Sequence, residues 1–565
     1  MTDVRARNVP ATHVRQLTDA GVHPLLARIY ASRGVTEPAE LDYALGGLLP
    51  WEPLHRADAM ARALADAIRD GRRLLVVADY DCDGATACAV ALRALRAFGA
   101  RVDYIVPNRF EFGYGLTPEI VAFAHRAKPA DILVTVDNGI AAVEGVDAAN
   151  RLGLQVLVTD HHLPGDRLPD ATCIVNPNQP GCGFPSKHLA GVGVMFYVML
   201  ALRAELRRRG AFAAKSEPNL ADLLDLVALG TVADVVRLDR NNRALVHQGL
   251  RRIRAGRMQP GVAALFRAAG RDPQAAATYD LGFVLGPRVN AAGRLDDMAL
   301  GIECLATDDR ARADTIAARL DGLNRERRAI ETDMRATALD RLDMDALQRR
   351  CSVSLFQPDW HQGVIGILAG RLKDQLHRPV IAFARGAEGE LKGSGRSIRG
   401  LNLRDALDLV DRRGPGLILR FGGHAAAAGL SIPEHRFPEF TDAFESVVSG
   451  LVSASDLERL IETDGSLPAG DITLDTARRL ESGIWGQGFP APLFDDTFTV
   501  ESQRIVGERH LRLRLARDGR QVDAILFNHA DPLPDRMRAV YRLGVNEFRG
   551  NATAQVTIER VLDDT

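Results

Sequence analysis

The stretch LLVVADYDCDG, residues 74–84, decides the fold of this chain. Its first five residues form a short apolar run that is typical of a buried strand in a parallel sheet. Asp79, Asp81 and Asp83 follow at once, and Gly84 permits a tight turn into a helix. Because ligands of open α/β sheets gather at the carboxyl ends of the strands, this stretch predicts an acidic functional site at one edge of a sheet.

Two further apolar runs end in the same way. ILVTV at 132–136 runs into Asp137, and VLVT at 156–159 runs into Asp160-His161-His162. One rim of the sheet would then carry five Asp and two His. So many carboxylates stay close together only if cations neutralise them or some hold protons. We therefore predict a site for two divalent metal ions, and the oxygen-rich ligand set favours magnesium or manganese over zinc.

Each motif alone also has a purely structural interpretation. The D-x-D-G stretch at 81–84 is equally a helix cap with solvated acids, and D-N-G at 137–139 is a common turn. The joint occurrence of the motifs at three successive strand ends favours metal binding. Two such metals can activate a water and stabilise the leaving oxygen of a phosphoester, so the pattern predicts phosphoester hydrolysis.

The bulk composition is that of an ordinary globular enzyme, with 565 residues, 46% of them hydrophobic, and a formal net charge of -2. This charge gives no global attraction to nucleic acid, so any phosphate-binding surface must be a local basic patch. The six cysteines form no C-x-x-C pair, which favours reduced thiols in a cytosol. With no signal pattern and no apolar run of membrane-spanning length, we expect a cytoplasmic protein.

Around the three apolar runs, strands alternate with helices. The pattern predicts a fourth strand at 102–106 and helices at 57–70 and 85–98. This alternation is typical of a parallel sheet covered on both faces. We therefore predict an α/β domain over residues 56–305, after a helical lead-in over residues 1–55.

The rest of the chain divides into three parts. Residues 306–350 form a long helical pattern that would span roughly 60 Å and connect two domains, unless it breaks into two helices at Gly322. Residues 351–455 predict a second α/β domain with glycine turns in GSGRS and FGGH. Residues 456–565 predict a linker and an all-β barrel, with the boundary at the Gly/Pro-rich stretch 483–492.

Several of these motifs carry a family resemblance. DYDCDGATA, VDNGI, TDHHLP and GTVADVV resemble the four motifs of the DHH phosphoesterase family. From about residue 50 to the C-terminus, further stretches resemble the bacterial single-strand-specific 5′→3′ DNA exonucleases of that family: PNRFEFGYGL, GPRVNAAGRLDD, WHQGVIGILAGRL, GSGRSIRG, FGGHAAAAG and WGQGFPAP. The resemblance implies an α/β protein with a parallel-sheet DHH domain, a long connecting helix, a second α/β DHH-associated domain and a C-terminal all-β OB-like domain.

The resemblance also implies a set of metal ligands. Asp81 would bind one metal and Asp83 the other, and Asp137 would bridge both. The remaining ligands would be His161 and Asp234 on the second metal. Val77 stands where many family members have a histidine, so the first metal would be more open or water-filled, or partly supported by Asp79. The catalytic residues would be Asp83, Asp137 and His162, with His162 contacting the scissile phosphate.

A further group of residues would hold the nucleic acid, although the alternative for any single arginine is a solvated surface charge. The resemblance implies a pocket for the 5′-terminal phosphate that is formed by Arg109, Ser394 and Arg396. Contacts to the strand backbone would come from Arg288, Asn290 and Arg294. His424 would line the cleft opposite the metals. On the barrel we expect a basic stripe to follow the strand, and we expect Phe527 and Phe548 to lie in the barrel core.

The expected function is therefore metal-dependent 5′→3′ exonuclease activity that releases 5′ mononucleotides from single-stranded DNA in repair and recombination. A cleft between the two α/β domains would admit one strand and exclude a duplex. The family implies single-strand-binding protein and a RecQ-type helicase as partners. The alternatives are a DHH-type oligonucleotide or cyclic-dinucleotide phosphodiesterase, which the chain length disfavours, and a non-catalytic scaffold, which the intact ligand set disfavours. No residue identifiably distinguishes DNA from RNA.

Overall fold

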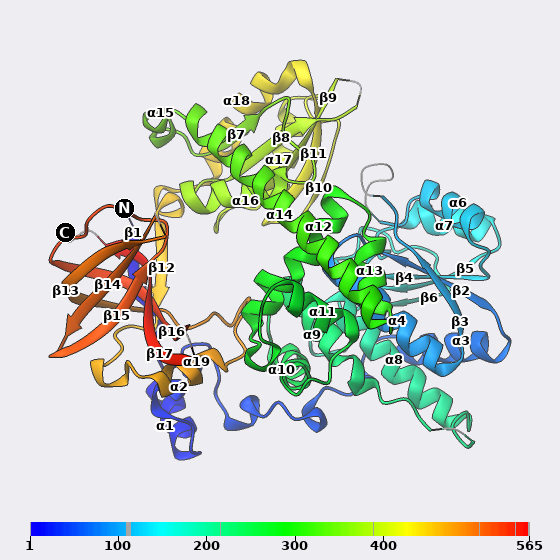
Figure 1. Cartoon of the computed structure of the whole chain (residues 1–565). Helices are drawn as coiled ribbons and strands as arrows, with labels where there is room; N and C mark the ends of the chain where they lie inside the picture. The colour runs from blue at the N-terminus through cyan, green and yellow to red at the C-terminus, as the bar shows by residue number, and fades with distance from the viewer. Residues whose placement is uncertain are drawn as a thin grey trace. The chain divides into compact units, whose positions relative to one another are not determined.

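The computed structural model describes residues 2–108, 115–214, 216–387, 389–507, 509–548 and 550–562. The chain divides into two compact units (Figure 1). The larger unit comprises residues 6–323 and 463–565, and the smaller comprises residues 324–462 together with the N-terminal residues up to Arg5.

A parallel sheet with the strand order β3-β2-β4-β5-β6 forms the centre of the larger unit. Its strands are β2 (Arg73–Ala78), β3 (Arg101–Ile105), β4 (Ile132–Val136), β5 (Gln155–Thr159) and β6 (Cys173–Val175). The four predicted strands are confirmed to within one residue at each end. β2 and β4 are buried almost throughout, which explains why their sequences are continuous apolar runs instead of alternating ones.

Helices cover both faces of this sheet (Figure 1). On one face lie α3 (Ala57–Arg69), α4 (Cys82–Phe98) and α8 (Gly191–Arg208), and on the other lie α6 (Pro118–Ala127) and α7 (Val143–Arg151). The helix α4 is buried on nearly all sides, and its many alanines let α8 pack closely against it. Asp81 caps this helix, and Gly99 ends it in the left-handed conformation with φ of 95°.

The remaining helices of the larger unit extend this core. They are α1 (Ala11–Asp19), α2 (Pro24–Ala31), α9 (Leu224–Ala233), α10 (Arg240–Arg254), α11 (Pro260–Ala268), the π-helix η5 (Asp280–Leu285), α12 (Gly286–Leu295) and α13 (Ala299–Ala306). The long α14 (Arg310–Arg341) then runs through Gly322 without a break, so the alternative of two helices separated there is wrong. It ends nine residues short of the predicted limit, and the short α15 (Met344–Gln348) follows.

The smaller unit is a mixed sheet in the order β10-β11-β9-β8-β7. Its strands are β7 (Val353–Phe356), β8 (Val380–Arg385), β9 (Glu390–Arg396), β10 (Arg420–Gly423) and β11 (Ala427–Pro433), and its helices are α16 (Ile365–Leu376), α17 (Leu403–Arg413) and α18 (Phe437–Leu451). Only β7 and β8 pair in parallel, and the other neighbours are antiparallel.

The glycine stretches of this unit lie in strands, so the prediction of a glycine turn is wrong for GSGRS, whereas FGGH leads directly into the turn between β10 and β11. GSGR belongs to β9, and FGG belongs to β10. A Cβ on Gly393 would lie 2.5 Å from Phe383 Cε1, and one on Gly395 would lie 2.7 Å from Leu403 Cδ2. These glycines therefore serve close packing of side chains across the sheet instead of a reversal of the chain.

Near the C-terminus lies a closed barrel in the order β13-β14-β15-β17-β16, as predicted (Figure 1). Its elements are β13 (Phe494–Val506), β14 (His510–Arg517), β15 (Arg520–Leu526), β16 (Arg536–Phe548) and β17 (Asn551–Leu562), with α19 (Leu474–Glu481) packed on β16 and β17. β12 (Arg459–Thr463) precedes the barrel and pairs with β1 (Thr2–Ala6). Phe527 and Phe548 are exposed, so their expected place in the core is wrong.

The Gly/Pro-rich stretch 483–492 is packed in the core. The prediction that this stretch is a domain boundary is therefore wrong. Trp485 and Phe489 stack on each other at 5.5 Å and are almost fully buried. Leu238 N donates a hydrogen bond to Gln487 O at 2.8 Å. A Cβ on Gly486 would lie 2.6 Å from Leu238 Cδ1, so glycine lets this loop lie against the backbone that follows α9. We refer to residues 485–489 as the docking loop.

Candidate metal centre

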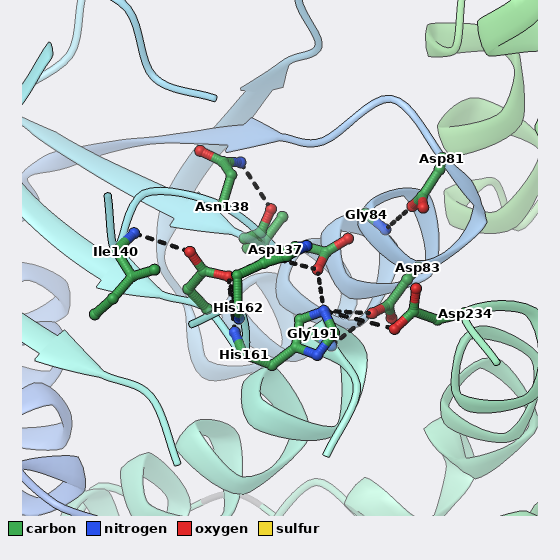
Figure 2. Close-up of polar contacts among 12 residues, drawn as sticks. Asp81, Asp83, Gly84, Asp137, Asn138, Ile140, His161, His162, Gly191 and Asp234 are labelled. Carbon is green, nitrogen blue, oxygen red and sulfur yellow. Dashed lines mark hydrogen bonds and ion pairs between the residues drawn. The ribbon is translucent and has the colours of Figure 1, made fainter. Parts of the chain in front are cut away.

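The predicted rim residues meet at the carboxyl ends of β2, β4 and β5, with His161 at their centre (Figure 2). His161 Nε2 lies 3.1 Å from Asp137 Oδ1, 3.5 Å from Asp234 Oδ2 and 3.9 Å from Asp83 Oδ2. Asp234 reaches the site from the C-terminal end of α9. One imidazole and three carboxylates from separate elements therefore face a common point.

Asp83 is held by the N-terminus of α8. Its Oδ2 accepts a hydrogen bond from Gly191 N at 2.6 Å, and its Oδ1 accepts one from Val192 N at 2.9 Å. The partial positive charge at a helix N-terminus stabilises the carboxylate form. A Cβ on Gly191 would lie 2.6 Å from Asp137 Oδ1, so only glycine allows α8 to begin this close to the rim.

Asp79 and Asp81 form a second cluster with Asp137, in which ligand oxygens of all three lie within 4.8 Å of one another. Asp81 Oδ1 also accepts a hydrogen bond from Gly84 N at 2.9 Å. Asp81 therefore caps α4 and lies in the acidic cluster at the same time. Val77 is buried on the α6 and α7 face of the sheet and directs no polar group at the rim. Val77 stands at the position where the resemblance implies a histidine, and the carboxylate of Asp79, two residues later, lies in the cluster.

Asp160 has a role that the sequence did not reveal. Its Oδ1 accepts hydrogen bonds from His161 N at 2.7 Å and His162 N at 3.1 Å, and it lies 2.8 Å from His162 Nδ1. Its Oδ2 accepts from Ile140 N at 2.8 Å. Asp160 is thus a buried support that orients both histidines, and the only sequence signal for it is a carboxylate directly before a His pair.

The D-N-G turn is at once a turn and part of the site. Asp137 adopts the left-handed conformation with φ of 63°, which is uncommon outside glycine, asparagine and aspartate. Asn138 Nδ2 donates hydrogen bonds to Val136 O at 2.9 Å and to Val77 O at 3.2 Å, tying the turn to two strand ends. This strained backbone points the Asp137 carboxylate into the cluster instead of into solvent.

Burial and mutual repulsion disturb the ionisation of the whole cluster. Burial first, and neighbouring carboxylates second, raise the pKa of Asp79 to about 8, raise that of Asp83 to about 7 and hold that of Asp137 well above its ordinary value. Burial, followed by the charge of His162, lowers the pKa of His161 to about 4. The cluster therefore presents a neutral imidazole and carboxyl groups that ionise together only if a cation is present.

His162 behaves in the opposite way. Burial alone would lower its pKa, but the hydrogen bond and charge of Asp160 raise it to about 9. Burial acts to raise the pKa of Asp160, but the hydrogen bond and charge of His162 outweigh burial and lower this pKa. The pair is therefore an imidazolium held by a carboxylate, suited to meeting a negatively charged group.

The donor set fits divalent cations. Asp137 Oδ1 and His161 Nε2 are buried, and within the described ranges neither atom has a hydrogen-bond partner. Such orphaned atoms are costly unless another group satisfies them. Three groups of ligand atoms could hold an ion, namely Asp137-His161-His162, Asp83-His161-Asp234 and Asp79-Asp81-Asp137. Carboxylate oxygens with one or two imidazoles suit manganese or magnesium.

A cavity of about 520 Å³ opens beside the cluster. Asp160 and His162 line it together with Gly139 and the first turns of α6 and α7. His162 is about half exposed, with 44% of its side chain accessible, so a ligand in this space can reach the imidazolium.

The predicted nucleic-acid residues of the larger unit differ in their surroundings. Arg109 lies outside the described residues. Arg288 is largely buried and contacts Asp321, with Nε 3.0 Å from Oδ1. Asn290 Oδ1 accepts a hydrogen bond from Cys82 N at 2.8 Å and so supports the loop that carries Asp81 and Asp83. Arg294 is partly buried on α12.

The predicted residues of the smaller unit lie on β9 and just after β10. Arg396 Nη1 donates to Ser394 Oγ at 3.2 Å, and a Cβ on Gly366 would lie 2.9 Å from that hydroxyl. Ser394 and Arg396 therefore stand together against the first turn of α16. His424 is exposed, and its Nδ1 accepts from Ala426 N at 3.2 Å.

Three domain families match parts of this chain. Models of the DHH family N-terminal domain, the DHHA1 domain and the RecJ OB domain match residues 73–231, 348–450 and 463–560. The single-stranded-DNA-specific exonuclease RecJ of Dickeya dadantii is 51% identical to this chain over 576 residues, covering 99% of both proteins. The chain belongs to the RecJ family. The RecJ exonuclease of Escherichia coli K12 is 50% identical over 96% of both proteins.

Solved RecJ structures agree with this assignment. The crystal structure of Thermus thermophilus RecJ in complex with Mn²⁺ matches with a TM-score of 0.84 and 31% identity, covering 100% of this chain and 80% of that one. The Mg²⁺ complex of the same RecJ matches with a TM-score of 0.78 and 30% identity, covering 100% and 79%. In the described part of this RecJ family member, no helix combines the length and apolarity needed to cross a bilayer.

Proposed function

We propose that this chain is a metal-dependent exonuclease that hydrolyses single-stranded DNA from its 5′ end to 5′ mononucleotides, in DNA repair and recombination. The observation that carries the proposal is the complete cluster of His161 with Asp83, Asp137 and Asp234, in a chain that matches RecJ exonucleases along its whole length.

Two divalent ions, manganese or magnesium, are the proposed cofactors. Asp79, Asp81 and Asp137 would hold one, and Asp83, Asp137, His161 and Asp234 would hold the other, which agrees with the clusters of ligand atoms. The RecJ structures in complex with Mn²⁺ and Mg²⁺ support this choice. When bound, such ions activate a water and neutralise charge on a phosphate.

His162 is the proposed phosphate-binding residue of the reaction. Asp160 keeps the Nδ1 of this ring protonated, and the raised pKa also keeps a proton on Nε2 that can be donated to a phosphate oxygen. The imidazolium would then stabilise the charge that grows on that oxygen as the phosphodiester bond breaks. Asp83 and Asp137 would act in the same step by holding the metal ions in position.

For the nucleic-acid strand, the geometry supports some predicted contacts more than others. Ser394 and Arg396 offer a hydroxyl beside a guanidinium, which suits a terminal phosphate, and Arg109 stays a proposed member of that pocket. His424 and Arg294 stay proposed strand contacts. For Arg288 and Asn290 the observed partners favour a supporting role, because both side chains already hold protein groups.

The decisive experiment compares Asp137→Asn with the matched control Asp131→Asn. Asp131 lies at the opposite end of the same sheet and pairs with exposed Arg73. We expect the first variant to lose digestion of 5′-end-labelled single strands in Mn²⁺ and in Mg²⁺ while still binding DNA, and the second to digest normally. Retained digestion by Asp137→Asn, or equal digestion of duplex and single strands by the native chain, would reject the proposal.

The full-length match to RecJ exonucleases favours neither of the two alternative functions that the sequence suggests. An oligonucleotide or cyclic-dinucleotide phosphodiesterase would prefer dinucleotides over long strands, and the barrel near the C-terminus favours long strands. A scaffold without activity would tolerate loss of the metal ligands. Rates on a dinucleotide and on a long strand, measured side by side, separate all three.

We further propose that the protein acts in the cytoplasm with single-strand-binding protein and a RecQ-type helicase. The six cysteines are all free thiols, which suits a reducing compartment. The two partners rest on the family resemblance alone, and co-purification with tagged versions of each would test them.

A further inference from the structure

Two large aromatic rings are turned to solvent together in the larger unit. Tyr279 and Phe283 stack with ring centroids 5.2 Å apart and an interplanar angle of 23°. Their exposed fractions are 60% and 65%. A stacked aromatic pair that stays this exposed leaves apolar surface uncovered, which is typical of a binding site.

The helix that carries the rings packs beside the metal cluster. Phe283 lies in the π-helix η5, and π-helical turns are frequent at functional sites. A Cβ on Gly282 would lie 3.1 Å from Val232 Cγ1, and one on Gly286 would lie 2.9 Å from the Cβ of Ala233. These two glycines thus hold η5 against the last turn of α9, directly before the metal ligand Asp234.

The same segment lies near enough to α19 for the charge of Asp280 to act on a carboxyl group of that helix. Asp280 accepts a hydrogen bond from Arg271 Nε at 2.8 Å, which fixes the first turn of η5. Burial raises the pKa of Glu481 in α19, and the charges of Asp280 and Arg271 also act on that carboxyl. Glu481 Oε1 accepts from Val545 N of β16 at 2.7 Å. The segment that carries the rings therefore packs against the helix that ends at Asp234 and lies near a helix that is packed on the barrel.

We propose that Tyr279 and Phe283 form a stacking platform for the nucleobases of a single strand, immediately 3′ of the phosphodiester held at the metal cluster. The proposal rests on the proposed function. Every base has a π-face, so an aromatic platform binds a strand without selecting its sequence. The segment that carries these rings packs against α9 directly before Asp234, so a strand held at the metal cluster is the occupant that we propose for them. Bases in a duplex already stack on one another and leave no face for the platform.

The test uses single strands that carry one 2-aminopurine at successive positions from the 5′ end, with EDTA present to stop hydrolysis. Stacking on an aromatic ring quenches this fluorescent base. We expect quenching at one or two positions with the native chain. Phe283→Ala and Tyr279→Ala should lose the quenching and weaken strand binding about tenfold, whereas Phe283→Trp should keep both. Phe283→Leu should behave like Phe283→Ala, because it keeps an apolar side chain without a π-face.

The controls separate failure of the platform from failure of the proposed function. Phe123→Ala removes an exposed ring on α6, and it should leave quenching and affinity unchanged. If the native chain digests single strands while Phe283→Ala quenches and binds as the native chain does, the platform is rejected and the exonuclease stands. A change of oligomeric state in Phe283→Ala, with DNA binding intact, would reject the platform in favour of a second copy covering the rings. If the native chain neither binds nor digests single strands, the proposed function itself fails.

Discussion

At the scale of single residues, Asp160 tests whether a supporting carboxylate matters as much as a ligand. Asp160→Ala removes the acceptor of three backbone N–H groups and of the His162 ring. We expect metal affinity or turnover to fall by about 10–100-fold, the usual cost of losing a partner that orients ligands. Titration calorimetry with Mn²⁺ and turnover at saturating metal would measure the two effects separately.

Gly191 offers a second test at this scale, with a control two residues away. Gly191→Ala would place a methyl group 2.6 Å from Asp137 Oδ1, whereas the same change at Gly193 meets Leu189 Cδ2 at 3.3 Å. Because a displacement of about 1 Å can cost about a hundredfold in rate, we expect Gly191→Ala to lose most activity. Gly193→Ala should keep activity within a few fold. Equal activity of the two variants would show that α8 does not position Asp137.

The sequence predicted the members of the cluster better than their supports. Asp137 and His161 could be found because strand ends and residue types are visible in sequence. The roles of Asp160 and Asn290 could not, since each depends on the direction of hydrogen bonds that only the folded backbone sets. The burial of Arg288 was missed for the same reason, because its partner Asp321 lies on another helix.

At the scale of elements, apolar periodicity predicted strands well and glycine content predicted them badly. The runs that became β2 and β4 are continuous and apolar, which leaves a buried strand as the consistent interpretation. The glycines of β9 suggested turns, because glycine is common there. In the folded unit they are required by the rings and methyl groups that press on the sheet, such as Phe383 on Gly393. Composition alone does not distinguish a flexible residue from a closely packed one.

The segment that joins β12 to β13 provides a prediction about stability and pH. Asp464 accepts hydrogen bonds from Arg33, just after α2, at 2.6 and 3.0 Å, and both side chains are buried. Burial alone would raise the pKa of Asp464, but Arg33 outweighs it and lowers the pKa below its ordinary value. A carboxyl whose pKa is lowered by folding stabilises the fold above its unfolded pKa, and this contribution is lost as the pH falls through the folded pKa.

Asp464→Asn should therefore lower the free energy of unfolding by about 3 kcal/mol at neutral pH, since it leaves Arg33 buried without its counter-charge. The difference from the native chain should shrink as the pH falls below about 4, near the ordinary aspartate pKa. Thermal unfolding at pH 7 and at lower pH, down to about 3, would measure it. The control Asp58→Asn removes an exposed partner of Arg62 and should change little at either pH. A pH-independent effect of Asp464→Asn would contradict the ion-pair explanation.

At the scale of the whole molecule, the order of domains was predictable and the joints between them were not. Alternating strands and helices, a long helix and a β-rich end all follow from periodicity. The docking loop was misjudged because its Gly and Pro content suggested a linker, while its Trp485 and Phe489 pack with Tyr30 and Arg243 from two other helical regions. A joint of this kind is built from contacts that no local pattern encodes.

The docking loop has a consequence for how such a protein can evolve. The backbone just after the proposed metal ligand Asp234 is held in place by Gln487, which belongs to the segment leading into the barrel. A gene fusion or truncation that removes the barrel together with the docking loop would therefore also remove this contact four residues after Asp234. We expect a variant that lacks the barrel to keep this contact only if it retains the chain through Phe489.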